Sequence, residues 1–505
     1  MARERTSAFA PLGGLWYSQL ALGSRIFATK SVEVLRAELA SADRLHRVLG
    51  PVALTSLGVG AIIGAGIFVM TGLAARDFAG PSLMLSFVLA GTGCALAALC
   101  YAEFASMIPV AGSAYTYAYA TLGELAAWII GWDLVLEYAI ASCAVAHGWS
   151  HYLQAFLGLF EVHLPPALAI DPMSAAPEVV AGAWHLGPVP IVFDLPAVAV
   201  VLLLTGVLVV GIRESAGLNS LIVALKLGIV IFVIAAGLGH VDTANWHPFF
   251  HHEKGLAGTF QGAAYVFFAY IGFDSISTHA EEARNPERDV PIGILVSLAL
   301  CTVLYIAVAG VLTGMVPYTQ LDIDAPIAHA FASFGLPVAT FIVAFGAVAG
   351  ITSVLLVMML SQARILLAMA RDGLLPPGFF AAIHPRYRTP HRSTILVGVI
   401  VAVVAALLPL KVLAELVNIG TLFAFVVVCA AVLIMRYTRP DVPRPFRTPF
   451  VPVVPVLGIA ANLTLMIALG WHNWARLFAW LAIGLVIYGC YGYHQSRFAP
   501  VRVDR

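Results

Sequence analysis

Two apolar stretches of this sequence contain glycines in a pattern that suits recognition of a zwitterion. The first runs from Gly58 to Phe68 and reads GVGAIIGAGIF, and the second runs from Phe267 to Asp274 and reads FFAYIGFD. Glycine destabilises a helix interior by roughly 1 kcal/mol relative to alanine. Inside a membrane the backbone groups freed by unwinding need partners, so unwinding is tolerated only beside a cavity. Unwound N–H groups suit a carboxylate and freed carbonyls suit an ammonium group.

The glycine spacing also has a second interpretation. Gly60 and Gly64 are four residues apart, as in the small-residue faces through which membrane helices pack. Two observations favour an interrupted helix: a second interruption opens the second half of the chain, and Asp274 follows it closely. A dinucleotide-binding fingerprint is disfavoured because three residues separate Gly60 from Gly64 and the surroundings do not have the pattern of a strand.

Several titratable residues occur within apolar runs. Lys226 lies about ten residues into such a run, and a lysine at the centre of a membrane span costs roughly 2.5–3.5 kcal/mol on insertion scales, so we expect a functional role rather than snorkelling. Asp133 and Glu137 are four residues apart and share one helical face. Glu137 either lines a binding pocket, where it would favour a cationic side chain, or pairs with another helix.

His147 and His151 are also four residues apart, which is the spacing of a possible metal pair. The sequence shows no third ligand in register with them, so we expect no metal and no cofactor. A protonatable role for His147 close to the site is the remaining alternative. The six cysteines have no paired spacing and are expected to pack in apolar helices rather than to form disulfides.

The composition places these residues in a polytopic membrane protein. Of 505 residues, 61% are hydrophobic and 11% charged, against roughly 45–50% and 25% in soluble domains. A spanning helix needs roughly 20 largely uncharged residues, and we count about twelve such runs. We therefore predict an all-α fold of about twelve transmembrane helices, starting near residues 52, 83, 124, 193, 217, 258, 292, 337, 393, 412, 453 and 475.

The distribution of positive charge predicts the orientation. With both termini in the cytoplasm of a plasma-membrane protein, 22 of the 27 Lys and Arg residues fall on the cytoplasmic side, as the positive-inside rule requires. The stretch from Ser31 to Arg47 is predicted to form an amphipathic helix on the cytoplasmic face of the membrane. A net charge of zero argues against nucleic acid as a partner.

The runs divide the chain into two comparable halves of five spans each. An odd number of spans makes the halves enter the membrane from opposite sides, and inverted repeats of this kind place a substrate near the midplane between interrupted helices. We predict these units: a cytoplasmic N-terminal segment (1–49), a first repeat (50–238), an inverted second repeat (256–436), two additional helices (453–493) and a cytoplasmic tail (494–505).

Other motifs accompany the glycine stretches: YAE at 101–103, PVAGSAY at 109–115, GWDLVLEY at 131–138, NSLIVALK at 219–226, EEARNP at 281–286 and RDGLLP at 371–376. Together they resemble the amino acid-polyamine-organocation superfamily, and within it the bacterial relatives of the cationic amino acid transporters. The resemblance implies the five-plus-five inverted-repeat fold of sodium-coupled leucine transporters. It also implies that this chain moves an amino acid across the membrane by alternating access.

The resemblance further implies a set of binding residues. The substrate carboxylate would meet backbone N–H groups of Gly64, Ala65 and Gly66, and the ammonium would meet the carbonyls of four residues: Ile62, Phe268, Ala269 and Ile271. Relatives often carry Thr where this chain has Ala65, so a hydroxyl contact to the carboxylate is missing. The side-chain walls are expected to be Phe273 and Ile351, with Tyr270 nearby, and these favour a modest neutral or aliphatic L-amino acid.

Sodium-coupled relatives hold a cation between the first and eighth helices, and the resemblance implies that the Lys226 ammonium takes its place. Because burial disfavours the charged form of a lysine, Lys226 could gain and lose a proton, which predicts proton coupling or uncoupled exchange rather than sodium coupling. An exchanger, a cationic amino acid or polyamine transporter, and a transport-inactive receptor remain alternatives. The sequence has no nucleotide, metalloprotease or hydrolase motif, so we do not expect an enzyme, and paired broken helices favour a carrier over a channel.

Overall fold

The computed structural model describes residues 25–30, 49–108, 113–187, 189–211 and 216–496. The amphipathic helix expected between Ser31 and Arg47 and most of the expected tail lie outside the described residues. The described chain is almost entirely helical, with one two-stranded antiparallel sheet formed by β1 (His185–Leu186) and β2 (Val189–Pro190). The predicted all-α polytopic fold is confirmed.

The long apolar helices lie at the positions expected from the sequence. Among the described residues, eight helical runs are long and apolar enough to cross a membrane, and four shorter apolar helices accompany them. In chain order the principal helices are α2 (Pro51–Ile62), α4 (Leu83–Met107), α6 (Glu124–Gly158), α8 (Leu195–Val210), α9 (Ala216–Leu238), α10 (Gly255–Val266), α12 (Pro286–Met315), α14 (Pro337–Arg371), α16 (His391–Leu407), α17 (Leu410–Thr438), α18 (Val453–Ala468) and α19 (Trp471–Ile487).

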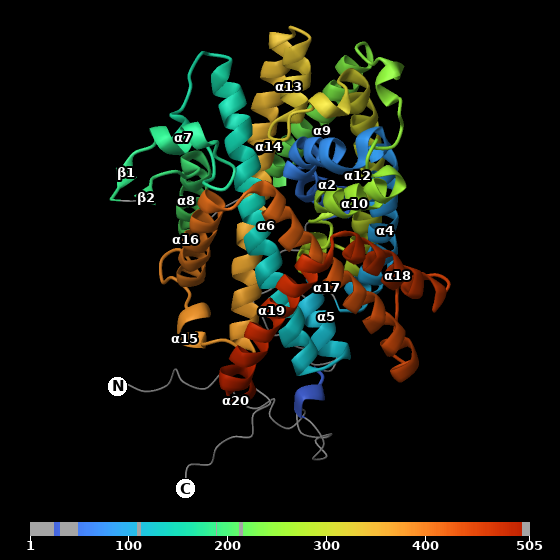
Figure 1. Cartoon of the computed structure of the whole chain (residues 1–505). Coiled ribbons are helices and arrows are strands. Elements are labelled where there is room, and N and C mark those ends of the chain that lie inside the picture. The colour runs from blue at the N-terminus through green and yellow to red at the C-terminus, as the bar shows by residue number, and fades with distance from the viewer. Residues whose placement is uncertain (1–24, 31–48, 109–112, 188, 212–215, 497–505) are drawn as a thin grey trace.

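Short helical elements connect or continue these helices. They are η1 (Arg25–Phe27), η2 (Gly66–Met70), α3 (Thr71–Ala74), η3 (Ala75–Ala79), η4 (Gly80–Ser82), α5 (Ser113–Thr121), η5 (Pro166–Leu168), α7 (Pro177–Gly182), η6 (Thr243–Trp246), η7 (Phe267–Tyr270), α11 (Ser275–Thr278), η8 (Ala280–Glu282), η9 (Tyr318–Gln320), α13 (Pro326–Ser333), α15 (Pro377–Phe380), η10 (Tyr488–Gly492) and α20 (Tyr493–Gln495). In Figure 1, α7 and α13 lie at one end of the molecule, and α15 and α20 lie at the other.

Helix starts follow from local sequence. Proline occupies one of the first two positions of α2, α8, α12 and α14, where its missing N–H breaks no helical hydrogen bond. Asp194 caps α8, because its Oδ1 accepts a hydrogen bond from the Ala197 N–H at 3.0 Å. The long helices α6 and α14 pack against each other, and α2 packs against α9 and α12. This arrangement encloses α2 within the helical bundle.

Candidate functional site

The first apolar glycine stretch is interrupted in the structure. Helix α2 ends at Ile62, and Ile63 adopts extended backbone angles (φ −73°, ψ 104°). The chain becomes helical again with Ala65 and with η2, a single π-type turn that begins at Gly66. At Gly64 an added Cβ would lie 2.7 Å from the Val354 side chain of α14. The break therefore occurs where the sequence predicted it, against a closely packed neighbouring helix.

The second glycine stretch is interrupted in a similar way. Helix α10 ends at Val266, the 3₁₀ turn η7 follows, and Ile271 is extended (φ −60°, ψ 134°) before α11 begins. Gly272 has a φ of 116°, a conformation that L residues rarely adopt. The glycine is thus required by the backbone at this break.

The two breaks are in direct backbone contact. A Cβ added at Gly66 would lie 2.2 Å from the Ala269 Cα, and a Cβ added at Gly272 would lie 2.8 Å from the Ala61 carbonyl oxygen. No side-chain rotation relieves contacts with backbone atoms. The structure therefore brings Gly64, Ala65 and Gly66 close to the second break, although about 200 residues of sequence separate the two.

The carbonyls around the breaks already take part in hydrogen bonds. The Tyr305 hydroxyl of α12 donates to the Ile62 carbonyl at 2.9 Å, and the Ile271 N–H donates to the Phe268 carbonyl at 3.3 Å. A carbonyl oxygen can accept two hydrogen bonds, so both groups retain acceptor capacity. Sequence reasoning missed Tyr305, because no motif marks a tyrosine that reaches the break from a continuous helix.

Lys226 lies between α2 and α14. Its Nζ donates a hydrogen bond of 2.6 Å to the carbonyl of Gly60, which is in the last turn of α2. The aliphatic part of Lys226 also lies against Gly350 of α14, where an added Cβ would be 3.4 Å from Lys226 Cγ. The last carbonyls of a helix lack intrahelical partners and favour a nearby cation. Lys226 places its amino group where the broken helix leaves these carbonyls.

The three expected side-chain walls have different surroundings. Phe273 is buried, with its ring centroid 5.7 Å from that of Tyr101 and 5.1 Å from that of Phe425. Ile351 is buried on α14. Tyr270 packs against Phe87, and its hydroxyl donates to the Phe87 carbonyl at 2.9 Å, which directs this side chain toward α4.

Asp133 and Glu137, the acidic pair of α6, are both buried. Both Asp133 carboxylate oxygens and Glu137 Oε2 accept no hydrogen bond from the described residues. A Cβ added at Gly420 would lie 3.0 Å from Asp133 Oδ1, so Asp133 faces α17. The adjacent Tyr138 hydroxyl donates to Asp274 Oδ2 at 2.8 Å and connects α6 to the second break. Tyr138 is a further residue that the sequence did not single out.

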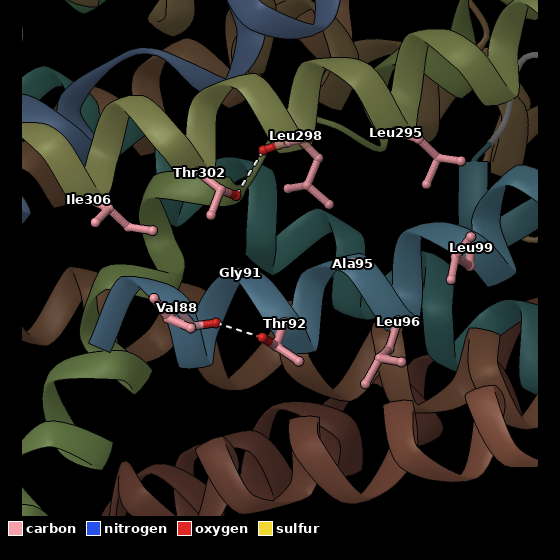
Figure 2. A pocket seen from close by; sticks show the side chains of 11 residues that line it. Val88, Gly91, Thr92, Ala95, Leu96, Leu99, Leu295, Leu298, Thr302 and Ile306 are labelled. Carbon is pink, nitrogen blue, oxygen red and sulfur yellow. Dashed lines mark hydrogen bonds between the residues drawn. The ribbon is translucent and has the colours of Figure 1, made fainter. Parts of the chain in front are cut away.

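One open groove of about 430 Å³ lies between α4 and α12. Figure 2 shows it lined mainly by aliphatic side chains, with Thr92 and Thr302 as the hydroxyl-bearing residues. Their hydroxyls donate to carbonyls of their own helices, at 2.7 Å to Val88 and 2.8 Å to Leu298. The groove therefore offers little to a zwitterion, and the helix breaks remain the candidate site.

Comparisons with known proteins agree with this arrangement. The family model described as amino acid permease matches residues 49–489. The chain is 47% identical to the branched-chain amino acid permease BcaP of Bacillus subtilis strain 168 over 94% of this chain and 98% of that protein. It is 46% identical to the methylthioribose transporter of the same organism, over 94% of this chain and 99% of that protein.

More distant similarity extends to plants. The chain is 40% identical to the vacuolar cationic amino acid transporter 4 of Arabidopsis thaliana, over 79% of this chain and 64% of that protein. The family match covers both helix breaks and the long apolar helices that surround them. This chain therefore belongs to the amino acid permease family of the amino acid-polyamine-organocation superfamily, and it is a multi-pass membrane transporter of amino acids rather than an enzyme.

Proposed function

We propose that this protein is a secondary active transporter that moves a neutral, aliphatic L-amino acid across the plasma membrane by alternating access. The observation that carries the proposal is the direct contact between the two helix breaks, with Gly66 against Ala269. Backbone donors and acceptors of both breaks would then surround one small ligand. In this proposal the five spans of residues 50–238 and those of residues 256–436 form inverted repeats, and the ligand binds at their interface.

The carboxylate would bind to the N–H groups of Gly64, Ala65 and Gly66, where the helix restarts and its dipole favours an anion. The ammonium would bind to carbonyls released on the opposite side, those of Ile62, Phe268, Ala269 and Ile271. Because position 65 is alanine, recognition of the carboxylate would depend on backbone donors alone. Side-chain selectivity would then come from Phe273, Ile351 and Glu137.

Proton coupling through Lys226 is part of the same proposal. The Lys226 ammonium holds the C-terminal end of α2 through the Gly60 carbonyl. Loss of the proton would remove the charge that favours this contact and would free α2 to move relative to α14. Proton release would then be linked to the change between the outward-open and inward-open states of alternating access. Uncoupled exchange of amino acids is the competing scheme, and it predicts no proton movement.

The apolar walls Phe273 and Ile351 support an aliphatic substrate, as does the 47% identity to a protein named as a branched-chain amino acid permease. A hydrophobic pocket discriminates by only about 1–3 kcal/mol per methylene group. We therefore expect several aliphatic amino acids to compete with one another. Glu137 is the residue that would extend the range to arginine or lysine.

A ligand screen followed by a flux measurement tests this function. The melting temperature of the purified protein is measured with each of the twenty amino acids, agmatine, putrescine and methylthioribose, because a ligand that binds the folded state stabilises it. We expect the largest increases with leucine, isoleucine, valine or alanine. A response confined to polyamines or methylthioribose would contradict the proposal, because these compounds have no carboxylate.

Flux into vesicles then separates transport from binding. We expect saturable uptake of the selected amino acid that increases when the outside is made acidic and that needs no sodium. Uptake that requires a sodium gradient and ignores pH would overturn proton coupling. Binding without uptake would identify a receptor. Exchange that is stimulated by substrate on the far side and is unaffected by pH would favour the uncoupled scheme.

A further inference from the structure

The folded chain adds two carboxylates to the histidine pair of α6. His147 and His151 are one helical turn apart, with their Nε2 atoms 3.0 Å from each other. Asp194, the capping residue of α8, places its Oδ2 3.6 Å from His147 Nδ1. Asp324, in the loop before α13, places its Oδ1 3.8 Å from His151 Nε2. We call these four residues the His–Asp cluster.

The spacing of the cluster fits a single small cation. Donor atoms that surround Zn²⁺ tetrahedrally at roughly 2.0–2.1 Å lie about 3.3 Å from one another. The Nε2 atoms of His147 and His151 are 3.0 Å apart, and His151 Nε2 is 3.8 Å from Asp324 Oδ1. Asp194 Oδ2 approaches the other ring nitrogen of His147, Nδ1, at 3.6 Å. Three residues, His147, His151 and Asp194, each have a metal-binding atom that lies within 4.8 Å of those of the other two.

Unsatisfied polar atoms within the cluster provide a second, independent observation. His147 and Asp194 are both at least 98% buried, and His147 Nδ1 and Asp194 Oδ2 have no hydrogen-bond partner among the described residues. The other Asp194 oxygen accepts hydrogen bonds from the Ser150 hydroxyl at 2.6 Å and from the Ala197 N–H. These bonds fix the carboxylate so that its free oxygen faces His147, as partners outside a metal's first shell commonly do.

The surroundings of the cluster also favour a cation. Asp171 and Asp322 add negative charge beside Asp324, and His329 Nδ1 lies 3.6 Å from Asp322 Oδ2. The His151 and Asp324 side chains are 11% and 42% exposed, so an ion can reach the cluster from solvent. Asp324 closely precedes α13, which lies at one end of the molecule (Figure 1).

We propose that the His–Asp cluster binds one divalent transition-metal ion, and that Zn²⁺ fits it best. Two imidazoles with carboxylates are a typical zinc ligand set, whereas Mg²⁺ and Ca²⁺ prefer oxygen ligands alone. The sequence could not assemble this set, because Asp194 and Asp324 are 43 and 173 residues beyond His151. Only the packing of α6, α8 and the loop before α13 brings the four residues together.

Direct metal binding tests this assignment. The full chain is purified with a tag that contains no histidine, stripped with chelator and titrated with ZnCl₂ in a calorimeter. We expect one Zn²⁺ per chain, and a higher melting temperature with ZnCl₂ than with MgCl₂. His151→Ala and Asp324→Asn should each weaken binding at least about tenfold, because each removes one ligand. Both sites are partly exposed, so these variants are expected to fold.

His472→Ala serves as the matched control, since His472 is exposed on α19, a helix that contributes no residue to the cluster. It should bind Zn²⁺ like the unaltered protein. The assignment is overturned if the unaltered chain binds no Zn²⁺ at millimolar concentration, or if His151→Ala and Asp324→Asn bind as tightly as the control. Either result would leave the cluster as a hydrogen-bonded histidine pair with carboxylate partners.

A functional consequence follows, and it rests on the proposed transport activity. The cluster-bearing part of α6 touches the first break, because the Tyr152 hydroxyl donates to the Phe68 carbonyl at 2.7 Å. A metal that joins α6 and α8 to the loop before α13 should restrain movement near this break, so ZnCl₂ should slow uptake without competing with the amino acid. His151→Ala should be insensitive. If metal-free protein shows no uptake, the transport proposal fails while calorimetry still decides the metal site.

Discussion

At the scale of single residues, Lys226 places a titratable amino group in a completely buried position. Its ammonium binds a carbonyl at the end of α2, and its stem packs against Gly350 of α14. A cation in this position is sensitive to any movement of α2 relative to α14. In the proposed mechanism, protonation of this side chain would therefore be linked to the geometry of the first break.

Replacing Lys226 by methionine removes this charge and keeps the length of the side chain. We expect Lys226→Met to lower uptake by more than about tenfold, equivalent to about 1.4 kcal/mol of activation free energy, and to remove the dependence of uptake on pH. The substrate-induced rise in melting temperature should remain. Lys411→Met, at an exposed lysine, is the control and should transport normally. A pH-dependent Lys226→Met protein would contradict the assigned role.

Gly66 shows how one residue sets the contact between the breaks. In Gly66→Ala the new methyl group would meet the backbone of Ala269 at 2.2 Å, so one break must shift. We expect a loss of about 1–3 kcal/mol in stability together with loss of uptake, measured by thermal unfolding and by vesicle flux. Gly228→Ala is the matched control, because nothing lies within 4 Å of its added Cβ. Normal uptake by Gly66→Ala would show that the breaks need not touch.

At the scale of elements, Glu103 holds the end of α4 to α17 and to the linker that follows it. Its carboxylate lies 2.7 Å from Arg436 Nη2 and 3.2 Å from Arg444 Nε, and it accepts a hydrogen bond from the Thr448 N–H at 2.8 Å. Glu103 is the last residue of the YAE motif at 101–103. The structure identifies its partners, which are more than 330 residues away.

Removing the charge of Glu103 should therefore destabilise the protein. Glu103→Gln leaves Arg444, which is almost completely buried, without its anionic partner. Breaking a buried ion pair in this way costs about 3–5 kcal/mol, and we expect a clear fall in the thermal unfolding temperature. The parallel change Asp441→Asn, at an exposed acid of the same linker, should have little effect. Equal melting temperatures for the two variants would exclude the bracing role.

At the scale of the whole molecule, twelve apolar regions and the placement of Lys and Arg predict one orientation. We expect a fluorescent protein fused after residue 495 to fluoresce in the cytoplasm. We also expect alkaline phosphatase inserted after Met173, in the segment between α6 and α8, to be active outside the membrane. The opposite pattern would reverse the predicted topology. The expected result follows from the positive-inside rule, because 22 of the 27 Lys and Arg residues then face the cytoplasm.

Much of this protein was determined by its sequence alone. Apolar runs of the length of a membrane span predicted the helices, since the bilayer core sets that length. Glycines within two of these runs predicted the breaks, because their effect on a helix is local. The predicted boundaries agree with the helices found, from α2 near residue 51 to α19 near residue 471. Patterns of this kind act over a few turns and can be read without tertiary information.

The tertiary structure alone decided which distant groups meet. Tyr305 donates a hydrogen bond to the Ile62 carbonyl and Tyr138 donates one to Asp274, and each pair is more than 100 residues apart in the sequence. Asp194 contacts His147, which lies 47 residues earlier. The reason is physical: a helix turns a side chain toward a partner only after packing has fixed its rotation and height relative to its neighbours. The sequence thus predicted a histidine pair without a third ligand, and the fold supplied the carboxylates that make it a candidate metal site.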